Sequence, residues 1–157
     1  MFRKAKSDLE SALKHNSKSY LAALHLLNIA QFEGDNQGAA RALDLANSIY
    51  PPNFLARARY AVHLMPRWGG SYDRVDAFIA HCRSQRVPES TIALIQAVKL
   101  EDQGHAAAER GHTKEAIAFF ERALPLSRAG GSRFRGVYLR YSLYFCAKYK
   151  FGGEYCS

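Results

Sequence analysis

The chain has 157 residues, 48% of them hydrophobic, which suits one domain with a continuous core. No apolar run is long enough to span a bilayer, and no apolar stretch follows the basic N-terminus, so the sequence predicts neither membrane insertion nor a secretory signal. The formal net charge is +8, and the 3 cysteines have no paired spacing. Such cysteines indicate reduced thiols and a cytoplasmic setting.

Helical periodicity, interrupted by glycine and proline, divides the chain into eight expected helices. No stretch alternates between apolar and polar residues over the length of a strand, so we expect an all-α fold. The expected spans are 2–15, 18–33, 37–49, 54–65, 72–85, 89–110, 113–127 and 133–150.

One spacing of small and large apolar residues recurs in alternate expected helices. Ala, a large apolar residue four positions on and Ala three further on would leave room for a closely packed neighbouring helix. The copies are Ala5, Leu9 and Ala12; Ala39, Leu43 and Ala46; a degenerate Val75, Ile79 and Cys82; and Ala116, Phe120 and Ala123.

This pattern, with Gly111 in the turn between two expected helices, resembles the tetratricopeptide-repeat family. The step from Ala5 to Ala39 equals the period of that family, which is about 34 residues. The resemblance is good over 92–127 and 20–51, fair over 2–19 and poor over 52–88. It implies a right-handed superhelical stack of helix hairpins forming a single domain, residues 1–157. Because the chain would begin and end within repeats, we expect it to be a segment of a longer protein and to self-associate through exposed end helices.

The resemblance also implies a function: a non-enzymatic scaffold for protein–protein interaction. In this family the concave face, lined by first-helix side chains, holds a protein or peptide. By position, Asn28 and Gln31 would lie on this face in one repeat, and Glu101 and His105 in a later one. Some members grip a terminal carboxylate with a clamp of Lys, Arg and Asn. Only Asn28 falls at a clamp position here, so we expect no clamp.

The middle of the chain is the least regular part. Its first helix would turn Arg57, Tyr60 and Leu64 inward. The segment that follows, MPRWGGSY, holds the only Trp of the chain and resembles a turn in bacterial helical-repeat proteins of unknown function. Trp68, beside Arg67, would either anchor a partner or cover the open end of the hairpin as a packing lid.

Basic and aromatic residues are interleaved near the C-terminal end, with six Lys or Arg and no acidic residue between positions 128 and 150. Such a segment can hold an acidic protein or peptide, with Arg133, Arg135 and Arg140 as candidate contacts. It can also hold nucleic acid, which is the first alternative function. Alternatively, its aromatic residues pack on the preceding hairpin and its arginines form a solvated surface.

The sequence offers no constellation for catalysis. The 6 histidines are scattered, and His105 and His112 lie too far apart to place two ligands on one turn of a helix. No phosphate-binding glycine loop or nucleophile motif occurs. We therefore expect no catalytic residue, no metal site and no cofactor. The second alternative function is an accessory region of a larger enzyme.

Overall fold

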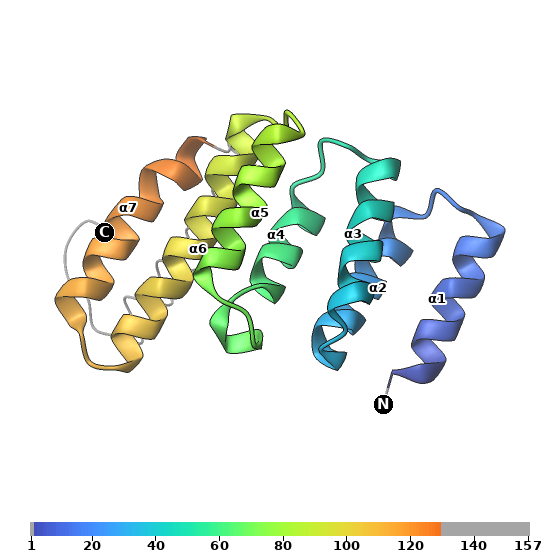
Figure 1. The fold of residues 1–157 in the computed structure, drawn as a ribbon, viewed down its shortest axis with the longest axis horizontal. Helices are drawn as coiled ribbons and strands as arrows, with labels where there is room; N and C mark the ends of the chain where they lie inside the picture. Colours follow the sequence, from blue (N-terminus) through green and yellow to red (C-terminus); the bar gives the residue numbers. More distant parts are fainter. Residues whose placement is uncertain (1, 130–157) are drawn as a thin grey trace. The chain divides into compact units, whose positions relative to one another are not determined.

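The computed structural model describes residues 2–129, and within this range every regular element is helical, as expected (Figure 1). The eighth expected helix, 133–150, lies outside the described residues, and so do Arg133, Arg135 and Arg140. The elements are α1 (Arg3–His15), α2 (Tyr20–Glu33), α3 (Asn36–Ile49), α4 (Leu55–His63), the 3₁₀ helix η1 (Pro66–Trp68), α5 (Tyr72–Ser84), α6 (Glu89–Glu109) and α7 (Thr113–Ala129).

The chain divides into two compact units, Met1–Pro88 and Glu89–Ser157. The first unit contains α1 to α5, and α2 packs against α1, α3 and α4. The second contains α6 and α7, which pack along each other as an antiparallel hairpin (Figure 1). Both hairpins α2–α3 and α6–α7 were expected from the sequence.

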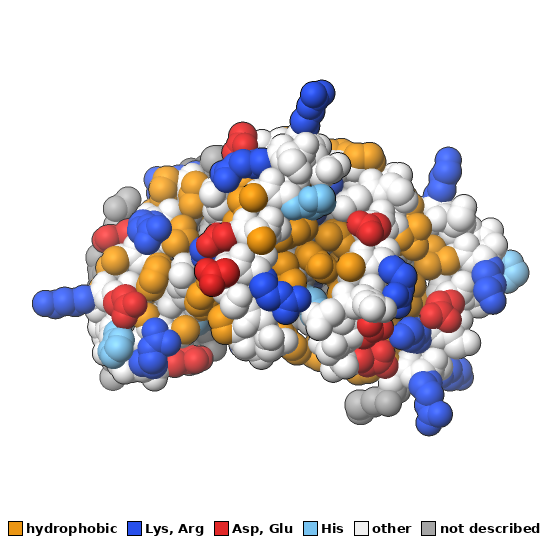
Figure 2. Space-filling model, in the orientation of Figure 1, with side chains coloured by type: hydrophobic (Ala, Val, Ile, Leu, Met, Phe, Trp, Pro, Cys, Tyr) orange, Lys and Arg blue, Asp and Glu red, His pale blue; other side chains and the backbone are white. Residues whose placement is uncertain are grey.

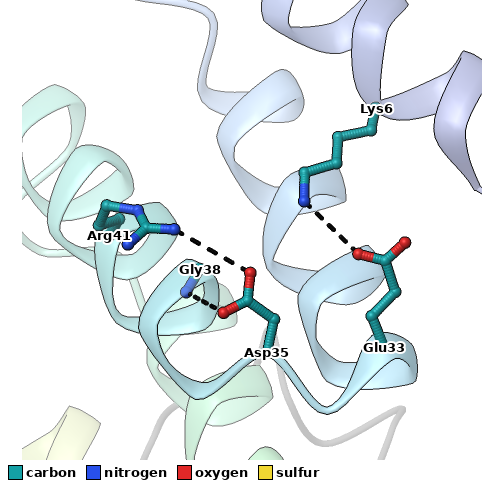
Figure 3. Close-up of polar contacts among 5 residues, drawn as sticks. All are labelled: Lys6, Glu33, Asp35, Gly38 and Arg41. Atoms are coloured by element: carbon teal, nitrogen blue, oxygen red, sulfur yellow. Dashed lines mark hydrogen bonds and ion pairs between the residues drawn. The ribbon is translucent and has the colours of Figure 1, made fainter.

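Glycine and aspartate set the turn between α2 and α3. Gly34 has φ 68°, a left-handed conformation that ends α2. Asp35 then caps α3, because its Oδ1 accepts a hydrogen bond of 2.8 Å from the backbone N–H of Gly38 (Figure 3). Its Oδ2 lies 4.0 Å from Nη2 of Arg41. The backbone hydrogen bond is the main reason why the pKa of Asp35 is lowered.

Helix α1 is held more loosely than the others, because none of its residues is fully buried. One ion pair joins it to the end of α2, with 3.5 Å between Nζ of Lys6 and Oε2 of Glu33 (Figure 3). Both side chains are partly exposed, so this pair contributes at most about 1 kcal/mol.

Three of the four recurring apolar triads belong to the core. The triads of α3, α5 and α7 are buried at every position, and in α7 Phe120 packs toward Gly104 of α6. The triad of α1 differs, since Ala5 and Ala12 are exposed and Leu9 is half-buried. The buried triads are Ala39, Leu43 and Ala46; Val75, Ile79 and Cys82; and Ala116, Phe120 and Ala123.

The repeat also appears in the burial of side chains. When residues 20–33 are aligned with residues 54–67, each pair of aligned side chains is alike in being buried, half-buried or exposed. The offset between the two ranges equals the step from Ala5 to Ala39, so the period continues through the middle of the chain, where the sequence pattern is least regular. Helices α2 and α4 therefore present the same sides to their surroundings.

Candidate binding face on helices α2 and α4

Helix α2 carries apolar residues on every side, including the side that faces solvent. Leu21, His25, Asn28 and Phe32 follow one another at intervals of four, three and four residues, so they lie along one side of the helix. Leu21 is 65% exposed and Phe32 is 63% exposed. Large apolar side chains gathered at an exposed surface are typical of interaction sites.

Helix α4 carries the equivalent row. Leu55 is 46% exposed, Arg59 is exposed and Val62 is half-buried. Because α2 and α4 pack against each other and share one burial pattern, the two rows form one surface. We call it the α2–α4 face, made of Leu21, His25, Asn28, Phe32, Leu55, Arg59, Val62 and Trp68.

Aromatic rings close one end of the face. The rings of Phe32 and Trp68 meet edge to face with their centroids 5.5 Å apart, and Phe2 stacks on Phe32 at 5.9 Å. Trp68 reaches this position from η1 through a turn that needs glycine. Gly69 has φ 81°, and a side chain on Gly70 would collide with the backbone carbonyl of Leu64.

Tyrosines support the other end of the face. The Tyr20 hydroxyl accepts a hydrogen bond from the backbone N–H of Ala56, in the first turn of α4, and burial raises the pKa of Tyr20. The rings of Tyr20 and Tyr50 meet edge to face at 6.2 Å. These contacts tie the start of α4 to the start of α2, where Leu21 and Leu55 are exposed.

An apolar hollow of about 500 Å³ extends from the face toward α1. Asp8, His25 and Asn28 are its polar residues, and its other walls are hydrophobic. Its size suits one or two large apolar side chains of a partner rather than a drug-sized ligand enclosed on all sides. Its lining consists of Phe2, Ala5, Asp8, Leu9, His25, Asn28, Ile29 and Phe32.

The structure places some predicted site residues on this face and others elsewhere. Asn28 and Trp68 lie on it, and Arg67 is exposed beside Trp68. Gln31 is 6% exposed and does not lie on this face, and its role as a contact stays a prediction. Gln31 follows the fully buried Leu27 by four residues, so both side chains lie on the buried side of α2.

Two of the three residues expected to turn inward in the middle repeat, Arg57 and Leu64, are buried in the structure. Arg57 is buried, and its Nη1 donates to the carbonyls of Pro51 and Asn53, both at 2.6 Å. Leu64 is 4% exposed. Arg57 therefore closes the loop before α4, and Leu64 belongs to the core.

Tyr60 points away from the α2–α4 face. Its ring meets that of Phe78 on α5 at 5.0 Å, and the charges of Arg74 on α5 and Asp44 on α3 act on its pKa. It therefore faces the region between α3 and α5, where Figure 2 shows hydrophobic side chains gathered. Burial raises the pKa of its hydroxyl.

Glu101 and His105 belong to α6, in the second unit. Both are half-buried. Burial raises the pKa of Glu101 to about 7. His105 lies edge-on to Phe120 of α7, with the ring centroids 6.1 Å apart. Their role in binding stays a prediction.

A polar cluster around the buried His63 joins α3, α4 and α5, and the sequence analysis missed it. His63 is 2% exposed, and its Nε2 lies 3.0 Å from Oδ1 of Asn36. Nη2 of Arg74 lies 3.4 Å from the same oxygen. Nδ1 of His63 is buried without a hydrogen-bond partner, and burial lowers the pKa of the imidazole. Because the three residues come from three helices, no local motif could have indicated the cluster.

The structure of residues 2–129 also bears on metal binding and on membrane insertion. No three His, Cys, Asp or Glu side chains in this part of the chain come close enough to share a metal ion. None of its helices has the length and apolar character needed to cross a bilayer.

Comparison with known proteins identifies one related domain. A family model described as a domain of unknown function (DUF4034) matches residues 25–89. This range covers α3 to α5 and most of α2, and it includes every residue of the α2–α4 face except Leu21. Searches of curated proteins and of solved structures find no match.

Proposed function

We propose that this chain is a non-enzymatic protein-interaction module of tetratricopeptide type, which binds a partner protein through the α2–α4 face. The exposure of Leu21, Phe32, Leu55 and Trp68 on two adjacent helices carries this proposal. Burying one such side chain in an interface contributes about 1.5–3 kcal/mol. A few apolar and aromatic anchors usually dominate the binding energy of an interface.

The recurrence of one burial pattern supports the tetratricopeptide type. The triads of small and large apolar residues in α3, α5 and α7 are buried, and the burial of α2 recurs in α4. In a stack of helix hairpins, equivalent first helices present equivalent side chains, so a continuous face for a partner follows from the repeat. We further propose a cytoplasmic setting, as the unpaired cysteine spacing indicates.

Site-specific photo-crosslinking tests this function. A photoreactive amino acid replaces His25, in the middle of the face, in cells that make the protein. We expect a discrete adduct that proteinase digests and nuclease does not. The control places the same group at Lys114, an exposed residue of α7. No adduct at position 25, or the same adducts at both positions, would contradict the proposal.

The two alternative functions predict other outcomes of the same experiment. An adduct sensitive to nuclease would favour the nucleic-acid-associated domain. A crosslink at position 25 to another part of the same polypeptide would favour an accessory region of a larger enzyme.

A further inference from the structure

The α2–α4 face has apolar ends and a basic middle. Leu21 and Leu55 are exposed at one end, and Phe32 with Trp68 at the other. The charged or titratable residues of the face, His25 and Arg59, stand at equivalent positions of the two helices, one turn from the leucines. The order along the face is therefore aliphatic, basic and aromatic.

The spacing of these groups follows from helix geometry. On α2, Leu21 precedes His25 by four residues, and Phe32 follows it by seven. At a rise of 1.5 Å per residue, these steps are about 6 Å and about 10 Å. The basic position is thus closer to the leucine end than to the aromatic end.

Arg59 is available to a partner. It is exposed, and it makes no hydrogen bond or ion pair with any residue of the described chain. The acids near α2 lie on the α1 side, where Asp8 lines the hollow and Glu33 pairs with Lys6. A carboxylate that approaches from the α4 side would therefore meet a free guanidinium, and such charge-assisted hydrogen bonds fix the register of an interface.

The face suits a helix better than an extended segment. An extended segment exposes its backbone N–H and C=O groups, which need partners when they are buried. Apart from the indole N–H of Trp68, the face offers three polar side chains for this purpose: His25, Asn28 and Arg59. A helix satisfies its own backbone, and its residues at i, i+4 and i+11 lie on one side with the spacing found on α2.

We propose that the α2–α4 face binds an amphipathic helix of a partner protein. This helix carries large apolar side chains at i and i+11, and one of them packs at the Leu21–Leu55 end of the face. A carboxylate lies four residues from that apolar side chain. The carboxylate pairs with Arg59. The apolar side chains pack at the Leu21–Leu55 end and against Phe32 and Trp68. This inference rests on the proposed function and names the chemistry of the partner.

Selection from a library of displayed helical peptides tests it. The peptides have eighteen residues and a randomised face, and they are selected against the wild-type protein and against Arg59→Glu. We expect wild-type selections to enrich Asp or Glu four residues from an apolar position, and Arg59→Glu selections to enrich Lys or Arg there. Each winning peptide should bind its own protein at least fivefold more tightly than the other. Lys114→Glu is the matched control, since it makes the same charge change on α7 and should select acidic peptides like the wild type.

The double variant Leu21→Glu/Leu55→Glu separates this inference from the proposed function, because both leucines are exposed and their replacement leaves the core intact. Circular dichroism confirms that the variant is folded. Two results would show that the inference is wrong while the proposed function stands. In both, the selected helices lose binding to Leu21→Glu/Leu55→Glu. In the first they show no preference for acidic residues, and in the second acidic residues are enriched on Arg59→Glu as well as on the wild type. If no selected helix depends on these leucines, the inference is wrong, and the crosslink at position 25 decides whether the proposed function stands.

Discussion

The ring of Trp68 meets the ring of Phe32 edge-on, at a centroid distance of 5.5 Å and an interplanar angle of 83°. The two residues lie far apart in the chain, one at the end of α2 and the other in the 3₁₀ turn after α4. This contact joins successive hairpins at the aromatic end of the α2–α4 face. Trp68 is 37% exposed, so it both packs against the neighbouring hairpin and remains open to a partner.

A double-mutant cycle measures this contact. Phe32→Ala and Trp68→Ala should each destabilise the protein, and their coupling energy should be about 0.5–1.5 kcal/mol, the usual value for an edge-to-face pair. Urea unfolding followed by circular dichroism gives the free energies. Leu55→Ala is the control, because it lies at the other end of the face and should be additive with Trp68→Ala. Strict additivity of Phe32 and Trp68 would show that the ring contact contributes nothing to stability.

Acid should destabilise the protein through His63. Burial lowers the pKa of His63 below its usual 6.5, and the nearby Arg74 lowers it further, while Asp35 acts weakly in the opposite direction. The unfolded chain therefore takes up the proton first as the pH falls. The stability that neutral His63 supports is complete above about pH 6.5 and is lost below it.

His63→Gln tests this pH dependence, because glutamine keeps a neutral donor toward Asn36 and cannot become charged. Between pH 7 and pH 5, we expect the urea midpoint of the wild type to decrease relative to that of His63→Gln, because only the wild type loses the contribution of neutral His63. His15→Gln, at an exposed position, should behave like the wild type. Equal slopes for His63→Gln and the wild type would show that His63 does not titrate in this range.

Glu101 should make stability change with pH in the direction opposite to that of His63. Burial raises its pKa from 4.5 to about 7, so the unfolded chain loses this proton at a lower pH than the folded protein does. Stability falls as the pH rises from about 4.5 to about 7. Glu101→Gln should therefore raise the urea midpoint at pH 8 and change it much less at pH 5. Glu121→Gln, on the exposed side of α7, should show no such difference between the two pH values.

The close approach of α6 and α7 depends on Gly104. Replacing a glycine within a helix by alanine ordinarily stabilises a protein by about 0.5–1 kcal/mol. At Gly104, however, a Cβ atom would lie 2.5 Å from Cε1 of Phe120. We expect Gly104→Ala to destabilise the protein by about 1–3 kcal/mol, as overpacked cores do.

A smaller side chain at position 120 provides the control for Gly104→Ala. In a Phe120→Leu background the ring is gone, so adding Gly104→Ala should cost much less than in the wild type, as measured by thermal unfolding. A stabilising Gly104→Ala substitution in the wild type would show that the helices can separate without loss.

The sequence by itself predicted the helices and much of their pairing. Glycine and proline have strong local preferences, so the boundaries of α2, α3, α6 and α7 followed from the turns around them. The buried triads of α3 and α7 were also predictable, because small residues at helical spacing are needed where two helices pack closely. These properties depend on residues close together in the chain.

Only the tertiary structure decided which side of α4 faces outward. The helix is short and rich in alanine, with Ala56, Ala58 and Ala61 on several sides, so its apolar pattern fits more than one orientation. Packing against α2, the Tyr20–Ala56 hydrogen bond and the Phe32–Trp68 contact select one of them. That choice buries Arg57 and exposes Arg59, because a rotation of the helix by two positions moves a side chain to the opposite side.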